Sequence, residues 1–192
     1  MIYMESSYEI LRNGGVGVLR TDTLYGIVCS ALDRTAVERV YELKGRDFDK
    51  PCIILIGDMS DLDRFPLAIN EYQRAFMEEH WPAPLSLIVS LDPDADEGYT
   101  YLHCNTHSLS FRIPNDAKLR TLLSQTGPLI APSANHQGKQ PATSIKEARM
   151  YFPHIDVYID GGVVRETSAS TVVRLERDGY TILREGAYIF NS

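Results

Sequence analysis

Three cations stand close together in the segment K-G-R-D-F-D-K, at Lys44, Arg46 and Lys50. Ammonium and guanidinium groups at this spacing can neutralise neighbouring negative charges, which indicates a pocket for a polyanion such as a nucleoside triphosphate. The same residues also suit the solvated C-terminus of a helix, where the macrodipole favours Lys and Arg. The segment therefore identifies a site only if the fold brings other polar residues to it.

Polar side chains also follow several apolar runs, at the points where strands are expected to end. They are Thr21, Asp22, Thr23, Arg112, Ser133, Asn135 and Arg184. Ligands of α/β sheets bind beyond the ends of strands, so convergence of these residues would build one cleft. Taken alone, the S-A-N segment at Ser133 is a polar turn, because Ser and Asn side chains hydrogen-bond the neighbouring backbone.

Other kinds of site find little support in the sequence. Neither G-x-x-x-x-G-K-[ST] nor G-x-G-x-x-G, the two common glycine-rich phosphate loops, follows any apolar run. Ser133 is not in a G-x-S-x-G turn, so we interpret it as a hydrogen-bonding serine and not as a hydrolase nucleophile. His103, Cys104 and His107 are too few for a zinc site without a second ligand pair. We interpret them as loop residues and expect no metal held by the protein.

The chain has 192 residues and a formal net charge of -7. This length predicts one domain over residues 1–192 with a core of its own. The negative charge argues against a protein that mainly binds nucleic-acid backbone, although a local basic cleft is compatible with it. Cys29, Cys52 and Cys104 are odd in number, and two lie in apolar runs, so we expect reduced thiols. The N-terminus has neither a leader pattern nor a membrane span, which predicts a cytoplasmic protein.

Apolar periodicity and capping residues predict helices at several places. They are expected at residues 6–13, 35–44, 70–81, 117–125 and 145–151. Ser6 or Ser7 is the candidate N-cap of the first helix, and Asp33 that of the second. Ser144 and Glu147 have the spacing of a capping box for the last one.

Apolar runs between these helices predict strands. They are expected at residues 16–19, 24–31, 53–56, 85–91, 108–112, 128–132, 170–175 and 180–185. The turn R-D-G at residues 177–179 indicates that the last two strands form a hairpin, so the sheet should be mixed and not purely parallel. Residues 92–107 are polar and turn-rich, and we expect a surface loop there, with a lid over the cavity as the alternative. The alternation of helices and strands predicts an α/β fold.

Several segments occur together in one order along the chain: L-R-T-D-T-L-Y-G, K-G-R-D-F-D-K-P, W-P-A-P-L-S-L-I-V, F-R-I-P, P-S-A-N-H-Q-G-K-Q-P-A-T, S-T-V-V-R-L and R-E-G-A. From about Gly14 to Ala187 the chain thereby resembles the YrdC-like family, the threonylcarbamoyl-AMP synthases, in its short form without an extra C-terminal domain. The K-x-R and S-x-N pairs are the most specific part of the resemblance. It implies a twisted mixed sheet with flanking helices around a cationic cavity.

The resemblance also implies a reaction and its partners. L-threonine, bicarbonate and ATP would give threonylcarbamoyl-adenylate and pyrophosphate, with Mg²⁺ carried by the nucleotide. A separate transferase complex would then use the adenylate to modify an adenosine of tRNA.

Site residues carry over from the family by position. Lys44 and Arg46 would be the catalytic pair on the phosphates and the carboxylated intermediate. The residues implied for ATP are Arg46, Lys50, Ser133, Asn135 and Arg184. Those implied for threonine are Thr23, Tyr25, Arg112, Ser133 and Ser170.

The sequence departs from the family pattern at Arg20 and Ala169, which replace prolines, and at Gln137, which replaces a serine. None of these removes an implied ligand. Two other functions remain open at this point: a related paralogue with carbamoyl-adenylate chemistry, and an RNA-binding module without catalysis. The negative net charge disfavours the RNA-binding module.

Overall fold

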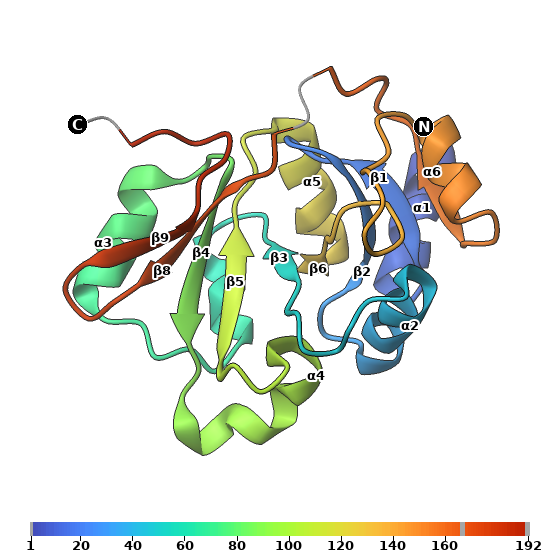
Figure 1. Cartoon of the computed structure of the whole chain (residues 1–192). Helices are drawn as coiled ribbons and strands as arrows, with labels where there is room; N and C mark the ends of the chain where they lie inside the picture. The colour runs from blue at the N-terminus through green and yellow to red at the C-terminus, as the bar shows by residue number, and fades with distance from the viewer. Residues whose placement is uncertain (1, 166–167, 191–192) are drawn as a thin grey trace.

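A computed structural model describes residues 2–165 and 168–190 (Figure 1). Within these residues, the strands form one nine-stranded mixed sheet in the order β7-β1-β2-β6-β3-β5-β4-β8-β9. The strands are β1 (Gly17–Arg20), β2 (Tyr25–Ser30), β3 (Ile53–Leu55), β4 (Leu85–Ser90), β5 (Ser108–Arg112), β6 (Leu129–Ile130), β7 (Val157–Ile159), β8 (Thr171–Leu175) and β9 (Tyr180–Arg184). β8 and β9 pair antiparallel, whereas β8 and β4 pair parallel. The predicted α/β fold with a mixed sheet is confirmed.

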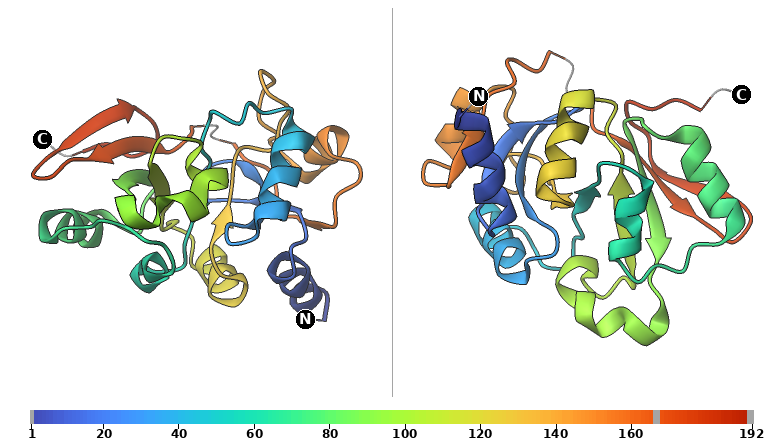
Figure 2. Two further views of the ribbon diagram at one scale, coloured as in Figure 1. Left: turned by 90° about the horizontal axis from the view of Figure 1, so that it is seen from below. Right: turned by 180° about the vertical axis from the view of Figure 1, so that it is seen from behind.

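Helices flank this sheet (Figure 2). They are α1 (Ile2–Arg12), α2 (Arg34–Lys44), α3 (Glu71–His80), α4 (Thr100–His103), α5 (Ala117–Thr126) and α6 (Ile145–Tyr151), with 3-10 segments η1 (Met59–Arg64) and η2 (Pro93–Tyr99). In the view from behind, α1, α5 and α3 lie along one side of the sheet, and α2 and α6 lie beside β1 and β2. Within the described residues, no helix is long and apolar enough to cross a bilayer.

Buried side chains form two apolar clusters between these layers. In the smaller one, Leu11 of α1 and Leu119, Leu122 and Leu123 of α5 pack against strand residues such as Leu55. The larger cluster contains residues of α2, α3 and most strands. Burial of this apolar surface is the main favourable term that holds the sheet and helices together.

Side chains alternate along the central strands, and this alternation separates core from cavity. Leu87 of β4, Phe111 of β5 and Val173 of β8 lie in the larger cluster. The preceding or following residues on these strands, including Ser110 and Arg174, line a cavity. A strand places successive side chains on opposite faces, so each strand contributes both to the core and to the candidate site.

Helix α2 begins and ends at residues that the sequence indicates. The Asp33 side chain accepts a hydrogen bond from Ala36 N–H at 3.0 Å and caps the first turn. Gly45 follows the helix with φ 57°, a left-handed conformation that glycine adopts without steric cost. This turn directs the chain away from the helix axis and brings Arg46 toward the cavity.

The first helix begins earlier than expected. α1 starts at Ile2, so Ser6 and Ser7 lie inside the helix and do not cap it. Helical stability in proteins comes mainly from packing, and α1 packs through Leu11 against α5. A local capping signal was therefore a poor guide to the start of this helix.

Residues 92–107 are not a plain surface loop. They contain η2 and α4, and Leu102 is buried. The Tyr101 hydroxyl donates to the main-chain oxygen of Ala31 at 3.0 Å, which fixes the segment against the end of β2. Aromatic and apolar residues inside a polar stretch gave this segment enough burial to fold.

One of the two hydrogen bonds of the expected capping box of α6 is present. Ser144 accepts from the Glu147 N–H at 3.3 Å. The Glu147 carboxylate, however, accepts from the N–H of Thr143 at 2.8 Å and not from that of Ser144. The segment η1 was not expected, and it is capped by Asp58, whose side chain accepts from Ser60 N–H at 2.7 Å.

Candidate active site

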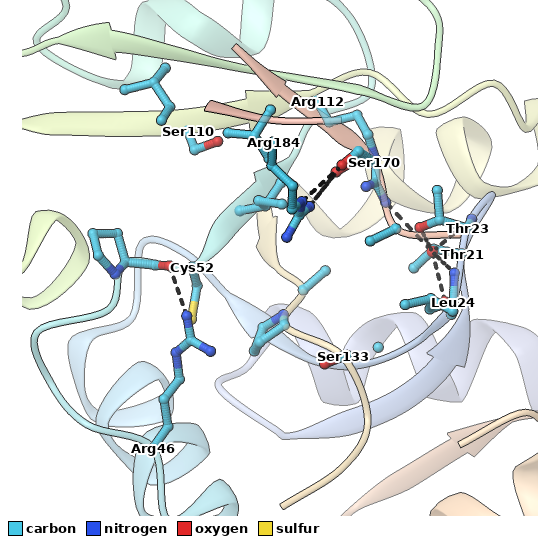
Figure 3. Close-up of a pocket in the computed structure, with 18 of the residues that line it drawn as sticks. Thr21, Thr23, Leu24, Arg46, Cys52, Ser110, Arg112, Ser133, Ser170 and Arg184 are labelled. Carbon is cyan, nitrogen blue, oxygen red and sulfur yellow. Dashed lines mark hydrogen bonds between the residues drawn. The ribbon is translucent and has the colours of Figure 1, made fainter. Parts of the chain in front are cut away.

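A cavity of about 360 Å³ lies between the central strands and the loops after α2 and β6 (Figure 3). Four arginines line it: Arg46, Arg112, Arg174 and Arg184. No Asp or Glu is among the lining residues in the described part of the chain. Arg112 pairs with the Asp22 carboxylate behind the cavity, whereas the other three guanidinium groups form no ion pair with a described residue. The cavity therefore concentrates positive potential, although the whole chain is acidic. The cavity is therefore built to take an anion.

Arg112 ends β5 and lies at one end of this cavity. It is 4 % exposed, and its Nη2 lies 3.0 Å from the Asp22 carboxylate and 3.5 Å from the Thr21 hydroxyl. Its Nε has no hydrogen-bond partner among the described residues. Burial lowers the pKa of Arg112 and Asp22 raises it, but a guanidinium stays protonated at neutral pH. A buried N–H without a partner is costly, which suggests that a ligand oxygen completes this group.

Thr21 and Thr23 are held beside Arg112 by the tight connection between β1 and β2. The Thr21 hydroxyl donates to Leu24 O at 2.7 Å, and the two threonine hydroxyls lie 3.1 Å apart. The predicted site residues Thr23 and Arg112 thus lie at the same end of the cavity (Figure 3). Small hydroxyl donors next to a guanidinium suit a ligand that carries both a carboxylate and a hydroxyl or amine.

Ser170 and Arg184 form the neighbouring wall. Arg184 donates from Nη2 to the main-chain oxygen of Ser170 at 2.8 Å and to its hydroxyl at 3.3 Å. The Ser170 hydroxyl also lies 2.8 Å from that of Ser86 on β4. Burial lowers the pKa of Arg184. The guanidinium is oriented by these bonds and keeps further N–H groups for a ligand.

Arg46 approaches from the other side of the cavity (Figure 3). Its Nε donates to the main-chain oxygen of Lys50 at 3.0 Å, and its Nη2 to that of Pro51 at 3.1 Å. These two bonds hold the guanidinium plane in place and leave other N–H groups to face the cavity. The loop backbone after α2 therefore pre-orients Arg46.

Lys44 is placed differently from its partner in the K-x-R pair. It is 2 % exposed and is not among the residues that line the cavity. Its ammonium donates to the main-chain oxygens of Ser133 and Asn135, the latter at 2.7 Å. Burial and the charge of Arg46 lower the pKa of Lys44 to about 8. The K-x-R and S-x-N segments are thus joined, but through the backbone of the second segment.

The side chains of the S-x-N segment hold one another. The Ser133 hydroxyl donates to the Asn135 side-chain oxygen at 2.6 Å. The Asn135 amide in turn donates to the main-chain oxygens of His136 and Lys139, at 2.9 and 2.7 Å. Ser133 lines the cavity, whereas Asn135 is buried and braces the loop.

Two of the implied ATP and threonine residues have other partners in this structure. Lys50 forms an exposed ion pair with Asp47 at 2.6 Å and is not among the cavity residues. The Tyr25 hydroxyl donates to Gly162 O at 2.7 Å and accepts from Gly161 N–H at 3.1 Å, which ties β2 to the segment after β7. Tyr25 nevertheless lines the cavity. All the substrate contacts that the resemblance implies, those of Lys50 and Tyr25 included, stay predictions.

Asp47 also joins the two loops at the mouth of the site. The Gln137 amide donates to the Asp47 carboxylate at 2.7 Å, and Asp47 N–H donates to the Gln137 side-chain oxygen at 3.0 Å. Gln137 N–H also donates to Lys44 O at 3.0 Å. The glutamine that departs from the family pattern is therefore a link between the loops that carry Arg46 and Ser133.

Sequence reasoning missed two cavity residues and one ion pair of the site. Arg174 and Ser110 line the cavity from the middle of strands, and Asp22 forms the ion pair with Arg112. The sequence indicated Asp22 as a polar residue at a strand end, but it did not indicate that Arg112 is its partner. For Arg174 and Ser110 the only local signal was a polar residue inside an apolar run, which does not say which face of the sheet it occupies.

The side chains that most often bind metal ions are those of His, Cys, Asp and Glu. Among the described residues, no three or more His, Cys, Asp or Glu side chains gather into a group that could hold a metal ion. His103 is buried, and its ring stacks on that of His107 with centroids 5.4 Å apart. Cys29, Cys52 and Cys104 are free thiols, of which Cys29 and Cys52 are buried.

The twisted mixed sheet and the arginine-lined cavity together define an α/β protein with an anion-binding site. The family model for Sua5, YciO and YrdC, described as telomere recombination, matches residues 9–186. The chain belongs to this Sua5/YciO/YrdC family, and the expected membership is confirmed.

Similar proteins agree with this membership. Threonylcarbamoyl-AMP synthase of Mus musculus is 32% identical over 190 residues, which cover 95% of this chain and 66% of that protein. Threonylcarbamoyl-AMP synthase of Bacillus subtilis is 32% identical over 179 residues, covering 92% and 51%. The chain thus spans about two thirds of the first relative and about half of the second.

Solved structures show the same fold. The structure of P. abyssi Sua5 complexed with L-threonine has a TM-score of 0.84 and 30% identity, covering 95% of this chain and 54% of that chain. E. coli YciO has a TM-score of 0.82 at 22% identity, a likeness that concerns the fold alone. The predicted fold of the family is confirmed.

Proposed function

We propose that this chain is a threonylcarbamoyl-AMP synthase, which forms L-threonylcarbamoyladenylate and pyrophosphate from L-threonine, bicarbonate and ATP. The observation that carries this proposal is a cavity with four arginines, and with no Asp or Glu among its described lining residues, in a chain of net charge -7. Bicarbonate and ATP are anions, and the N-carboxylated threonine carries two carboxylates, so the protein must neutralise charge before the reacting groups can approach. The relatives from Mus musculus and Bacillus subtilis are named threonylcarbamoyl-AMP synthases, which supports the same activity.

The amino acid would bind at the end of the cavity that carries Thr21, Thr23 and Arg112. The buried Nε of Arg112, which has no partner among the described residues, would donate to the carboxylate of threonine. Thr23 and Ser170 would supply hydroxyl groups to the rest of the substrate. Binding of L-threonine by P. abyssi Sua5 supports this assignment.

The chemistry then requires alignment more than a protein nucleophile. The amine of threonine and bicarbonate give N-carboxythreonine with loss of water, and its new carboxylate attacks the α-phosphate of ATP. A carboxylate oxygen to phosphorus bond forms, the bond to the β-phosphate oxygen breaks, and pyrophosphate leaves. Arg46 and Arg184 would offset the charge that develops on the transferring group, as guanidinium groups do in other phosphoryl displacements.

The remaining site residues that the family resemblance implies would position other groups or bind the nucleotide. Lys44 would position the S-x-N loop through its bonds to the main-chain oxygens of Ser133 and Asn135. Ser133 would hydrogen-bond the nucleotide, and Asn135 would hold the loop in shape. Lys50 would leave Asp47 for the phosphates when nucleotide binds, since phosphate competes well with an exposed ion pair.

Several parts of the proposal concern molecules beyond this chain. Mg²⁺ would enter with the nucleotide as part of the substrate. The unstable adenylate would pass to a separate complex that transfers the threonylcarbamoyl group to tRNA, and we propose a cytoplasmic location for both steps.

Pyrophosphate release by the purified chain tests the function. ATP, Mg²⁺, bicarbonate and L-threonine are supplied together, and each is then omitted in turn. Release that needs all components, and an adenylate product of the corresponding mass, would support the synthase. Release that continues without threonine or bicarbonate would contradict it and point to a simple nucleotide hydrolase. An electrostatic RNA affinity without turnover would favour the RNA-binding alternative.

A further inference from the structure

We propose that Arg174 and Ser110 form a further subsite of the cavity, which binds the polyphosphate tail of the nucleotide and then the pyrophosphate that leaves. This inference rests on the proposed function and extends it to two residues outside the K-x-R and S-x-N pairs. Both residues line the cavity, on strands β8 and β5.

Cross-strand register places these two residues in one row. Ser110 lies opposite Ile88 of β4, and Ile88 lies opposite Arg174 of β8. Neighbouring strands are about 4.8 Å apart, so the two Cα atoms are about 10 Å apart. Directly opposite residues point to the same face of a sheet, and a long arginine side chain can reach toward Ser110 across Ile88.

Arg174 differs from the other cavity arginines in having no partner among the described residues. Arg46, Arg112 and Arg184 are each anchored by backbone or side-chain oxygens. The exposed Arg174 side chain makes neither a hydrogen bond nor an ion pair with any described residue. All its N–H groups are therefore available, and its planar fork suits an anion with several oxygens.

Ser110 supplies a second, independent observation. Its side chain is buried at 8 % exposure, and its Oγ has no hydrogen-bond partner among the described residues. The hydroxyls of Thr106 and Ser108 nearby are engaged, with His103 O at 2.6 Å and with Thr106 Oγ1 at 3.3 Å respectively. A buried polar group without a partner needs an explanation, and a ligand oxygen in the cavity provides one.

The position along the strands separates Arg174 from the threonine end of the cavity. Val172 of β8 lies opposite Arg184, and Arg174 is two residues farther along β8. At about 3.3 Å per residue, the Arg174 backbone is roughly 7 Å beyond the row of Arg184. The threonine end, at Arg112, is thus separate from Arg174.

Glu176 follows the last residue of β8 and is two residues beyond Arg174. The Thr181 hydroxyl donates to its carboxylate at 3.5 Å, and no ion pair joins it to Arg174. The charge of Arg174 is therefore not neutralised by its nearest acidic neighbour on the strand.

Direct binding of inorganic pyrophosphate to the full chain tests the subsite without catalysis. We compare Arg174→Gln with the control Arg177→Gln, which removes the same charge from the β8–β9 turn outside the cavity. Loss of a charge-assisted contact should weaken pyrophosphate binding by about tenfold to a hundredfold in Arg174→Gln. The control should change it less than about twofold, as expected for a screened surface charge.

Ser110→Ala gives a readout that a structural role would not produce. Removal of an unsatisfied buried hydroxyl should leave the melting temperature unchanged or raised. The same variant should weaken pyrophosphate binding by about twofold to tenfold, the range of a single neutral hydrogen bond. In turnover, both variants should raise the KM for ATP and leave the KM for L-threonine within about twofold of wild type, because the threonine end is separate.

Other outcomes have distinct meanings. Equal pyrophosphate affinity in Arg174→Gln and Arg177→Gln would overturn the subsite, even if wild-type chain makes the adenylate. Weaker binding of AMP but not of pyrophosphate would also overturn it, because Arg174 would then contact the nucleoside. If pyrophosphate binding depends on Arg174 and Ser110 but wild-type chain releases none from its substrates, the subsite stands and the proposed synthase reaction fails.

Discussion

The ammonium of Lys44 donates a hydrogen bond to the main-chain oxygen of Asn135 at 2.7 Å, and it donates a second to that of Ser133. These bonds tie the last residue of α2 to the loop after β6. Lys44 is buried, and the Asn135 oxygen accepts from its ammonium, whereas the Ser133 oxygen also accepts from the Asn135 N–H at 2.9 Å. The K-x-R and S-x-N pairs are consequently one structural unit, and Arg46 and Ser133 line the cavity from its two halves.

Replacement of Lys44 should therefore disturb the loop more than it changes the cavity charge. In Lys44→Met the loop loses both bonds from the ammonium, and the Ser133 oxygen keeps only that from the Asn135 N–H. We expect kcat for pyrophosphate release to fall by at least about tenfold, which corresponds to about 1.4 kcal/mol of transition-state stabilisation. The KM for L-threonine should change much less, since Arg112 is at the other end. A variant with normal kcat and a raised KM for ATP would instead favour direct phosphate contact by Lys44.

The pH dependence of stability should report the same buried amine. The folded pKa of Lys44 is about 8, below its ordinary value of 10.5. Between these values the unfolded chain holds a proton that the folded chain has lost, so raising the pH favours the folded state. The unfolding free energy of wild type relative to Lys44→Met should rise by about 2 kcal/mol from pH 8 to pH 10. Denaturant titrations of both proteins measure this difference, and a constant or falling difference would contradict the lowered pKa.

Arg46 should be sensitive even to a change that keeps its charge. Its guanidinium is held by the main-chain oxygens of Lys50 and Pro51, a geometry that an ammonium cannot reproduce. For Arg46→Ala we expect a loss of about 2 to 4 kcal/mol of transition-state stabilisation in kcat/KM, as for other preorganised donors. Arg46→Lys should recover only a small part of it. Near-wild-type turnover in Arg46→Ala would exclude this role.

The Asp22 and Arg112 pair should affect both stability and threonine binding. Asp22→Asn leaves a buried guanidinium without its carboxylate, and the unfolding free energy should fall by about 3 kcal/mol. The double variant Asp22→Asn/Arg112→Gln should recover much of that loss, because no buried charge is left unpaired. Threonine binding, measured by calorimetry, should remain lost in the double variant. Recovery of threonine affinity there would show that Arg112 does not bind the substrate.

Gln137 should matter to nucleotide binding and little to stability. Gln137→Ala removes both side-chain bonds to Asp47. These bonds are solvent-exposed, so the unfolding free energy should change by less than about 1 kcal/mol. The loops would lose a constraint on their relative position, and we expect the KM for ATP to rise by about twofold to tenfold. Gln140→Ala, an exposed glutamine in the same loop, is the matched control and should leave the KM unchanged.

Local sequence signals predicted the elements whose ends depend on neighbouring residues. Asp33 and Gly45 bound α2, and Asp116 and Gly127 bound α5, as expected from capping rules. The start of α1 and the helical turns within residues 92–107 were missed, because packing against distant segments decided them. Capping joins residues within one helical turn, whereas packing can join residues at any separation in the sequence.

The sequence by itself determined the family, the α/β layout and the types of residue that reach the cavity. Ordered motifs and strand-end positions were sufficient for Arg46, Arg112 and Arg184. Only the tertiary structure decided that Lys44 donates to backbone oxygens and that Lys50 pairs with Asp47. It also decided that Arg174 and Ser110 line the cavity without a hydrogen-bond partner in the part of the chain that the structure describes. Long polar side chains have many rotamers, and the groups that distant segments bring within hydrogen-bond distance select among them.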